Sequence, residues 1–285
     1  MNDDVMVVDD GQETPKAEAK VRVYGAGSPV LLLSGGPGFS ADYMEPLARE
    51  LELQYMAVLP DLRGTGTNVV DPTPENLSLD AHVQDVENLR QKYGWDKFSF
   101  VAHSSGAQIA LAYALKYPHF VKSIALLDPA GTDMAYLADF DREANARLNR
   151  LDKEILADWK AGNGDFTEGL VTFLYRVVFD RRTANKIVDM VPQKSFVNVQ
   201  TSEVFNQNLI DSGFNITDRL GELSNIPVYV AHGLLDPLPY EVGKSIAEKT
   251  GGKFVLQDNC AHFPWIEVPR EFYPQFLGFL FQNAW

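Results

Sequence analysis

The sequence predicts an α/β fold in which helices flank a central, mostly parallel sheet. Short, continuously apolar segments end in glycine-rich or polar turns, which is typical of strands buried on both faces. Segments with the periodicity of amphipathic helices lie between them, and this alternation indicates βαβ units. With 285 residues, of which 45% are hydrophobic, the chain is long enough for one sizeable core and an insertion.

The predicted elements follow one another in a regular order. The strands, each with its following turn, are expected at 29–38, 55–64, 98–106, 121–131, 227–236 and 252–262. The helices are expected at 43–52, 79–93, 105–117, 239–249 and 269–282. The first twenty residues are acidic and contain Pro15, and they are expected to form a loose arm or an edge hairpin.

One segment interrupts the alternation. From Thr132 to Leu223 the chain is charged and predicted to be helical, with no strand pattern inside it. We interpret residues 132–223 as a helical cap inserted after the sixth strand, and residues 1–131 and 224–285 as the core domain.

Composition narrows the range of partners. The net charge of −14 is not accompanied by a basic stripe, so a nucleic-acid partner is not expected. The N-terminus carries acids where a signal peptide needs a basic and then an apolar segment, and no apolar run approaches a membrane span. Cys260 is the single cysteine, which excludes an intramolecular disulfide and a cysteine metal cluster. A cytoplasmic protein acting on a small molecule or short peptide is expected, with a removed signal peptide as the alternative.

The stretch "AHSSG" contains the candidate nucleophile. It differs from the G-x-S-x-G pattern of a strand-to-helix elbow at its first position, where Ala102 replaces glycine. The elbow needs small residues two positions before and after the nucleophile. Ala102 and Gly106 meet this need around Ser104, whereas His103 would be one of the flanking residues around Ser105. We therefore predict that Ser104 is the nucleophile and that Ser105 supplies a backbone N–H to the oxyanion. The alternative is that Ser104 caps the helix.

A serine nucleophile needs a base and an acid that orients the base. On this architecture the acid and then the histidine follow later strands. Asp236 follows the segment "VYVAHG", and His262 follows "KFVLQDNCA", so both occur in the expected order. Asp128 also ends a predicted strand and is the alternative acid, whereas Asp258 is expected to be a turn residue.

The other histidines and the cysteine are given structural roles. We expect His103 to pack or bond locally, His232 to be structural, and His82 and His119 to lie at the surface or at helix ends. The five scattered histidines form no metal-binding motif, so no metal and no cofactor are predicted. Cys260 is expected to be a small buried residue, with redox sensitivity as the alternative.

The segment "SGGPG" is the predicted second source of oxyanion donors. Gly35 and Gly36 let the backbone pass close to a reacting carbonyl, and Pro37 restricts the turn. We assign the second donor to the Gly36 N–H. The alternative is an ordinary turn at the end of a strand.

Several stretches together resemble the proline iminopeptidase branch of the α/β-hydrolase fold. They are "SGGPGF", "DLRGTGTN", "AHSSGAQIALAYALKYP", "HGLLDP" and "AHFPWIEVP", and the resemblance does not extend over the cap. It implies the same triad and oxyanion donors, and it gives Arg63 a role in anchoring loops. Ser34 stands where this branch usually has histidine.

The same resemblance raises the question of how a substrate amine would be held. Aminopeptidases of this branch bind the free amine with glutamates, and Leu234 stands where an acid could have stood in the acid loop. The cap offers four glutamates, and the sequence leaves open which of them faces the site: Glu143, Glu154, Glu168 and Glu203.

The sequence therefore predicts a serine hydrolase that cleaves an amide or ester through an acyl-enzyme. A prolyl-aminopeptidase-like peptidase is favoured, with a carboxylesterase or lactonase of small apolar substrates as the alternative. A binding or receptor protein that keeps the fold without turnover is the alternative of a different class. The Ser104 nucleophile argues against branches that use aspartate at the elbow.

Overall fold

The computed structural model describes residues 20–191 and 197–285 and contains one seven-stranded sheet. Its strand order is β1-β3-β2-β4-β5-β6-β7, and β1 pairs antiparallel with β3 while the remaining neighbours pair parallel. The strands are β1 (Val21–Tyr24), β2 (Ser28–Leu33), β3 (Tyr55–Pro60), β4 (Phe98–His103), β5 (Val121–Leu127), β6 (Val228–Gly233) and β7 (Lys253–Gln257). The prediction of a mostly parallel α/β sheet is confirmed.

The edge strand β1 is not predicted by the sequence, because "VRVY" is only four residues long and only partly buried. The six predicted strands correspond to β2 through β7. The expected N-terminal arm or hairpin covers residues 1–20, and all but Lys20 of it lies outside the described residues.

The helices predicted around the sheet are present. They are η1 (Ala41–Met44) with α1 (Glu45–Leu51), α2 (Leu79–Tyr93), α3 (Gly106–Lys116), α9 (Tyr240–Thr250) and α11 (Pro269–Asn283). The short helices η2 (Pro118–Phe120) and α10 (Pro264–Glu267) are not predicted by the sequence. Helix α2 shows why helix boundaries can be predicted from the sequence. At its start the Ser78 hydroxyl accepts a hydrogen bond from the Ala81 N–H. At its end Gly94 adopts the left-handed conformation, with φ of 67°.

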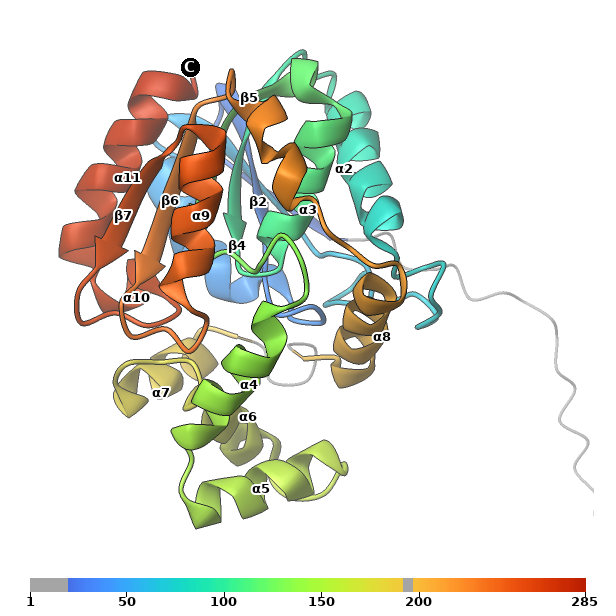
Figure 1. The fold of residues 1–285 in the computed structure, drawn as a ribbon, viewed down its shortest axis with the longest axis vertical. Coiled ribbons are helices and arrows are strands. Elements are labelled where there is room, and N and C mark those ends of the chain that lie inside the picture. Colours follow the sequence, from blue (N-terminus) through green and yellow to red (C-terminus); the bar gives the residue numbers. More distant parts are fainter. Residues whose placement is uncertain (1–19, 192–196) are drawn as a thin grey trace, which may run out of the picture.

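Helices cover both faces of the sheet (Figure 1). Successive side chains of β2 point to opposite faces, so Val30 and Leu32 pack with α1 and α11. Leu31 and Leu33 pack on the other face, in the cluster that includes residues of α2, α3 and α9. Burial on both faces explains why these strands are continuously apolar rather than alternating.

The helical insertion, residues 132–223, follows β5, the fifth strand among the described residues. The sequence predicts that it follows the sixth strand, so the strand count differs by one. It contains α4 (Tyr136–Ala146), α5 (Arg150–Lys160), α6 (Phe166–Leu174), α7 (Arg181–Asp189), α8 (Val199–Asp211) and η3 (Thr217–Leu223).

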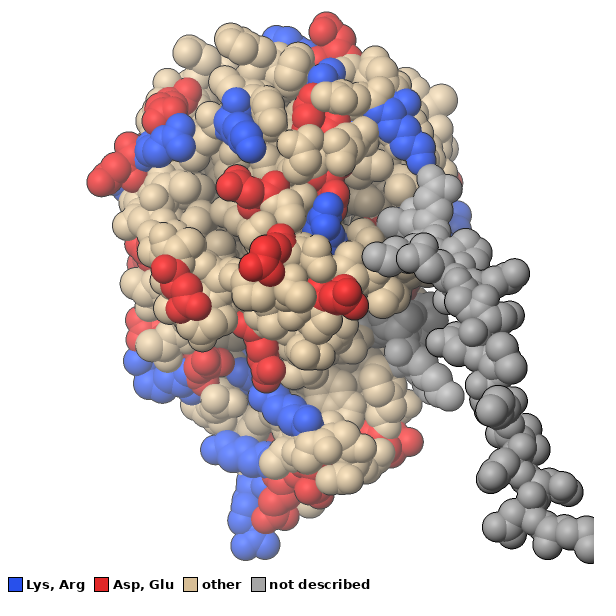
Figure 2. Space-filling model, turned by 90° about the vertical axis from the view of Figure 1, so that its right-hand side faces the viewer, with Lys and Arg blue, Asp and Glu red and all other residues tan. Residues whose placement is uncertain are grey.

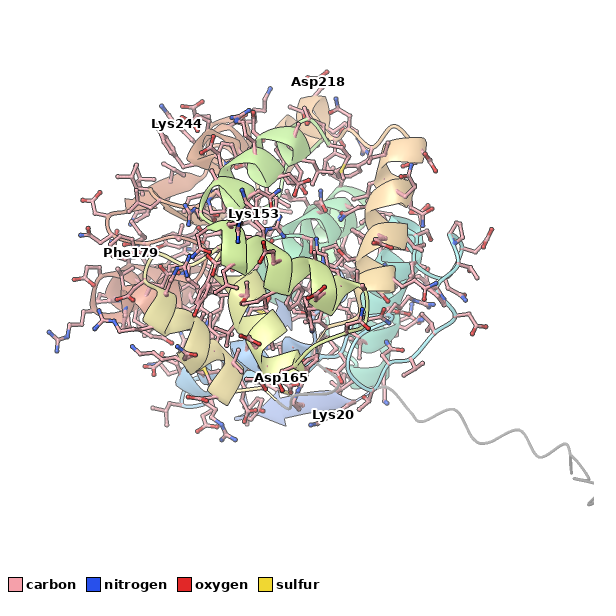
Figure 3. All side chains as sticks on the ribbon, turned by 90° about the horizontal axis from the view of Figure 1, so that it is seen from below. Lys20, Lys153, Asp165, Phe179, Asp218 and Lys244 are labelled. Carbon is pink, nitrogen blue, oxygen red and sulfur yellow. The ribbon has the colours of Figure 1, made fainter. Side chains whose placement is uncertain are left out.

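The position of the insertion determines where a site can form. The carboxyl ends of β4, β6 and β7 point toward α4 to α7 (Figure 1), and these helices lie across the view from below (Figure 3). Functional side chains of open parallel sheets gather at this edge. The last segment, η3, packs instead against α3 and α9, and its Leu220 and Leu223 are buried in the core.

The surface in Figure 2 carries acidic and basic side chains side by side, and on this face Lys and Arg do not gather into one broad patch. Among residues 20–191 and 197–285, no helix is long and apolar enough to cross a membrane.

Candidate active site

Ser104 occupies a strained turn between β4 and α3. Its φ is +51°, in the left-handed region that non-glycine residues rarely adopt, and its N–H donates to Leu127 O at 3.0 Å. A Cβ on Gly35 would lie 2.4 Å from Ser104 Cβ, and one on Gly106 would lie 2.6 Å from Leu33 O. The turn therefore requires small neighbours, as the sequence pattern indicated.

The alternative of Ser104 as a helix cap finds no support in the geometry. Ser105 occupies the N-cap position of α3, and no side-chain cap hydrogen bond forms there. Ser104 instead lines a cavity together with Ser105.

Asp236 and His262 are brought together from two neighbouring strand ends. His262 Nδ1 lies 2.6 Å from Asp236 Oδ2, and Leu238 N–H donates to Asp236 Oδ1 at 2.9 Å. Burial alone would raise the pKa of Asp236, but the charge and hydrogen bond of His262 hold it below its usual value. The carboxylate thus orients the His262 ring and places a negative charge behind it.

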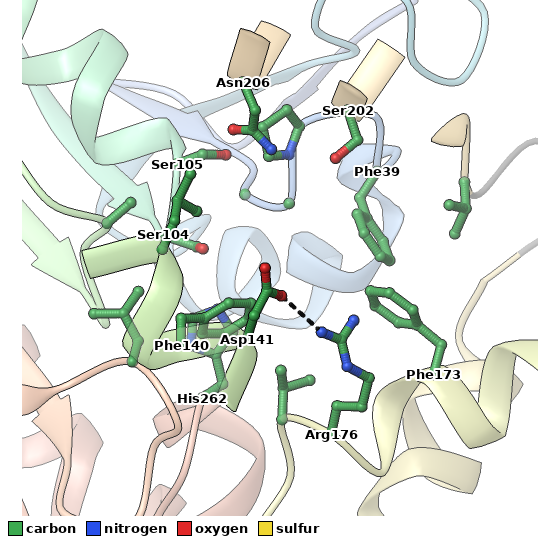
Figure 4. A pocket seen from close by; sticks show the side chains of 18 of the residues that line it. Phe39, Ser104, Ser105, Phe140, Asp141, Phe173, Arg176, Ser202, Asn206 and His262 are labelled. Atoms are coloured by element: carbon green, nitrogen blue, oxygen red, sulfur yellow. Dashed lines mark hydrogen bonds and ion pairs between the residues drawn. The ribbon is translucent and has the colours of Figure 1, made fainter. Parts of the chain in front are cut away.

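The cavity in front of these residues has a volume of about 500 Å³. Its core wall includes Gly36, Ser104, Ser105 and His262, and its other walls come from the insertion. Figure 4 shows Ser104 and His262 on one side of the cavity, with Phe173 and Arg176 of the insertion opposite. Four of the five predicted site residues therefore line one cavity, and the fifth, Asp236, is bonded to His262.

The glycine loop has one amide that is already engaged. Gly35 N–H donates to the Tyr43 hydroxyl at 2.6 Å. Gly36 adopts φ of +57°, and a Cβ there would lie 2.3 Å from the Phe39 ring, so the turn requires glycine. With the Gly35 amide occupied, Gly36 is the better placed of the two glycines to donate into the cavity.

Asp128, the alternative acid, is buried beside the pair. Its Oδ1 accepts from Gly233 N–H at 2.8 Å, and its Oδ2 has no hydrogen-bond partner among the described residues. Burial and the negative charge of Asp236 raise the pKa of Asp128 well above its ordinary value. The structure therefore bonds His262 to Asp236 and leaves Asp128 behind them.

These three residues are also the group whose chemistry could suit a metal. One ligand atom each of Asp128, Asp236 and His262 lies within 4.8 Å of the others. The Nδ1 of His262 and the Oδ2 of Asp236, however, are bonded to each other. The hydrogen bond between these two atoms orients the His262 imidazole, and it uses the atoms that a metal would need as ligands.

Comparison with known proteins places this geometry in a family. The family model described as the alpha/beta hydrolase fold matches residues 28–269. The chain belongs to the α/β-hydrolase fold family.

Curated relatives and solved structures agree with this assignment. A proline iminopeptidase from Clostridioides difficile is 23% identical over 86% of both chains. A putative carbamate hydrolase from Rhizobium rhizogenes is 27% identical over 88% of this chain and 92% of its own. A thermophilic esterase from Thermogutta terrifontis has the same fold, with a TM-score of 0.70 and 22% identity over 93% of both chains. The similarity to proline iminopeptidases is thus supported, within a group that also includes other hydrolases.

In this α/β hydrolase, His103 links the glycine loop to the histidine loop. Its Nδ1 lies 2.8 Å from the Tyr43 hydroxyl, and its Nε2 lies 2.8 Å from His262 O. Because the hydroxyl accepts from Gly35 and the carbonyl can only accept, Tyr43 donates to Nδ1 and Nε2–H donates to His262 O. Burial lowers the pKa of His103 well below its ordinary value, in keeping with this neutral tautomer. His103 thus packs and forms hydrogen bonds, as expected, but its partners lie 60 and 159 positions away in the sequence.

The remaining histidines divide between the interior and the surface. His232 is buried and its Nε2 lies 2.9 Å from Leu238 O, which agrees with a structural role. His82 lies in the first turn of α2, which agrees with the expected position at a helix end, but it is not at the surface: it is only 5% exposed and packs against Phe205 of the insertion. The sequence around His82 contains no sign of α8, which covers it from far along the chain. His119 is exposed.

Three other predictions concern single residues. Asp258 is an exposed turn residue, and Cys260 is buried as expected. Arg63 donates from Nε and Nη2 to the two carboxylate oxygens of Asp85, at 2.6 and 2.8 Å, which confirms that it anchors the loop by charge-assisted bonds.

Of the four cap glutamates, Glu203 lines the cavity. Glu143 and Glu154 pair at the surface with Arg142 and Arg150, and Glu168 is exposed near the start of α6. The exposed Leu234 leaves the acid loop without a carboxylate at its position.

Sequence reasoning missed several residues that shape the site. The Glu267 carboxylate accepts from the N–H groups of Ala261 and Phe263, which flank His262, and from Phe179 of the insertion. Arg147 donates to Leu235 O, just before Asp236. The contacts of Glu267 with Phe179 and of Arg147 with Leu235 each join residues 88 positions apart, so no local pattern could have shown them.

Proposed function

We propose that this α/β hydrolase cleaves an ester or amide of a small molecule or short peptide through an acyl-enzyme. The observation that carries the proposal is the His262–Asp236 hydrogen bond of 2.6 Å on a cavity that Ser104 also lines from a left-handed turn. A serine on such a turn beside an oriented imidazole is the arrangement that nucleophilic acyl transfer needs.

In the proposed reaction, Ser104 Oγ attacks the substrate carbonyl while His262 Nε2 takes its proton. Asp236 keeps the other ring nitrogen protonated and stabilises the imidazolium that forms. The N–H groups of Gly36 and Ser105 stabilise the oxyanion. His262 then protonates the leaving group, and attack by water on the ester to Ser104 regenerates the enzyme.

The residues of the insertion are proposed to form the lid of this site and to select the substrate. The lining includes Phe39, Phe140, Trp159 and Phe173, so a largely apolar substrate fits. The acids of the insertion that line it, Asp141 and Glu203, are exposed and would hold a substrate amine only weakly. We therefore place an esterase or amidase without an amine subsite first.

A prolyl aminopeptidase is the second candidate. Its support is the similarity to proteins named proline iminopeptidase and the presence of Glu203 on the cavity wall. The lactonase alternative shares the mechanism of the first candidate.

A single substrate panel tests the proposal. It contains proline, alanine and leucine p-nitroanilides with free amines, the same compounds N-acetylated, and short p-nitrophenyl esters. We expect ester turnover, indifference to acetylation, and a loss of several orders of magnitude in Ser104→Ala. A strong preference for the free-amine prolyl anilide would favour the aminopeptidase, and turnover that survives in Ser104→Ala would contradict the mechanism.

A further inference from the structure

One charged residue of the insertion is buried at the cavity wall. Arg176 follows α6 and is only 6% exposed, and it lines the cavity opposite Ser104 (Figure 4). Burying a guanidinium is costly unless its charge and its five N–H donors find partners.

Among the described residues, only part of the Arg176 guanidinium finds hydrogen-bond partners. Nη2 donates to Asp141 Oδ1 at 3.1 Å, across to α4, but the Asp141 side chain is 63% exposed. The Nε atom is buried without a hydrogen-bond partner among the described residues. The rings of Phe140 and Phe173 lie 5.9 and 5.3 Å from the guanidinium carbon. The Arg176 guanidinium is therefore shielded from water by aromatic rings, and its charge is paired with a single carboxylate, that of Asp141, which is exposed.

A second cation lies near the first. Lys160, which is exposed like Asp141 and Glu203, also lines the cavity, and partial burial together with the positive charge of Arg176 lowers the pKa of its ammonium. An anion placed between them would be attracted by both charges. An ammonium placed there would be repelled by both, and only the exposed acids Asp141 and Glu203 would compensate.

We propose that the substrate of this site carries a carboxylate, which Arg176 binds while Ser104 attacks the ester or amide carbonyl at the other end of the cavity. The inference rests on the proposed function and adds the substrate class: short esters or amides of acids with a second, distal carboxylate. The bound carboxylate competes with Asp141 for the guanidinium. Planar, two-oxygen anions suit this donor because its N–H groups form a fork.

The test compares two esters that differ in one group. The first is the p-nitrophenyl monoester of adipic acid, and the second is the same ester with the distal carboxylate replaced by a primary amide. The quantity measured is the ratio of their kcat/KM values. We expect the wild type to favour the carboxylate at least about 10-fold, and Arg176→Gln to lower this ratio about 10- to 100-fold, the range for one charge-assisted pair.

Variants and controls make the result specific. Arg176→Lys should give an intermediate ratio, because the charge remains and the fork is lost. Asp141→Asn should raise the ratio, since it removes the competing carboxylate. Arg182→Gln, on the exposed surface of α7 and away from the cavity, is the matched control and should keep the wild-type ratio.

Each outcome decides between distinct claims. A wild-type ratio near one, or an equal ratio in Arg176→Gln, overturns the carboxylate subsite and leaves the proposed function standing. If the wild type turns over esters of the substrate panel but neither of these two, the carboxylate subsite is overturned. If it turns over none of them, the proposed function fails, and titration calorimetry with adipate decides the inference by itself. Binding that is lost in Arg176→Gln then supports it, and no binding to the wild type overturns it.

Discussion

At the scale of single residues, two buried aspartates with opposite environments lie behind His262. Asp236 accepts from His262, and its pKa is held low by that partner despite burial. Asp128 has an oxygen without a hydrogen-bond partner among the described residues, and burial together with the negative charge of Asp236 raises its pKa. Two nearby carboxyl groups whose pKa values are pushed apart take different roles.

The first prediction separates these roles by activity. Asp236→Asn should lower kcat by roughly 10⁴, because the wrong tautomer of His262 becomes favoured. Asp128→Asn has the shape of a protonated carboxyl group and should keep kcat within about 10-fold of the wild type. Both are measured on an activated ester with folded protein confirmed by circular dichroism. A near-normal Asp236→Asn enzyme beside an inactive Asp128→Asn one would reverse the assignment.

The second prediction concerns the pH dependence of stability. Because the pKa of Asp128 is higher in the folded chain than in the unfolded one, its contribution is present in acid and is lost as pH rises toward the folded value. The Asp128→Asn side chain does not ionise, so this pH-dependent contribution to stability is absent in the variant. The free energy of unfolding of Asp128→Asn minus that of the wild type should therefore grow with pH, by up to about 1.4 kcal/mol per unit above about pH 4. Urea titrations at several pH values measure it, and a constant difference would refute a raised pKa.

At the scale of elements, the insertion is hydrogen-bonded to the loops that carry Asp236 and His262, the candidate acid and base. His262 N–H donates to Val177 O at 3.1 Å, and Glu267 binds N–H groups on each side of His262 and one of the insertion. The segment after α6 thus contacts the histidine loop directly, next to Arg176. A change in the residues of the insertion that line the cavity is therefore expected to affect the position of His262.

The third prediction tests this connection. Glu267→Gln keeps the size of the side chain but turns one acceptor into a donor that faces a backbone N–H. A buried unsatisfied group costs about 1–3 kcal/mol, so we expect a lower melting temperature and reduced kcat on an activated ester. Glu271→Gln, exposed in the first turn of α11, is the control and should leave both unchanged. Wild-type activity in Glu267→Gln would show that the loop does not depend on this carboxylate.

The elements themselves differ in how well the sequence predicts them. The helices around the sheet are bounded by recognisable signals, such as Ser78 and Gly94 of α2, and their predicted ends agree closely with the structure. The four-residue β1 has no such signal. Inside the insertion, the sequence predicts helices but not which faces turn inward, because that depends on contacts such as Asp141 with Arg176, 35 residues apart.

At the scale of the whole molecule, topology explains why the geometry of the candidate site could be predicted. The carboxyl ends of parallel strands meet at one edge, so residues that follow β4, β6 and β7 come together although 158 positions separate Ser104 from His262. The choice of substrate could not be predicted in the same way. In our proposal it depends on Arg176 and Asp141, which the sequence shows only as charges on helical segments, where charges usually face water.

The central claim is that Ser104 is an activated nucleophile, and covalent labelling tests it most directly. The intact protein is incubated with a fluorophosphonate at neutral pH, and the modified residue is identified by mass spectrometry of its peptides. The account predicts one phosphonyl group on Ser104, no labelling of Ser104→Ala, and persistent labelling of Ser105→Ala, because its backbone amide is retained. An unlabelled wild type, or a label on Ser105 with Ser104 free, would contradict the account and favour a binding protein that keeps the fold.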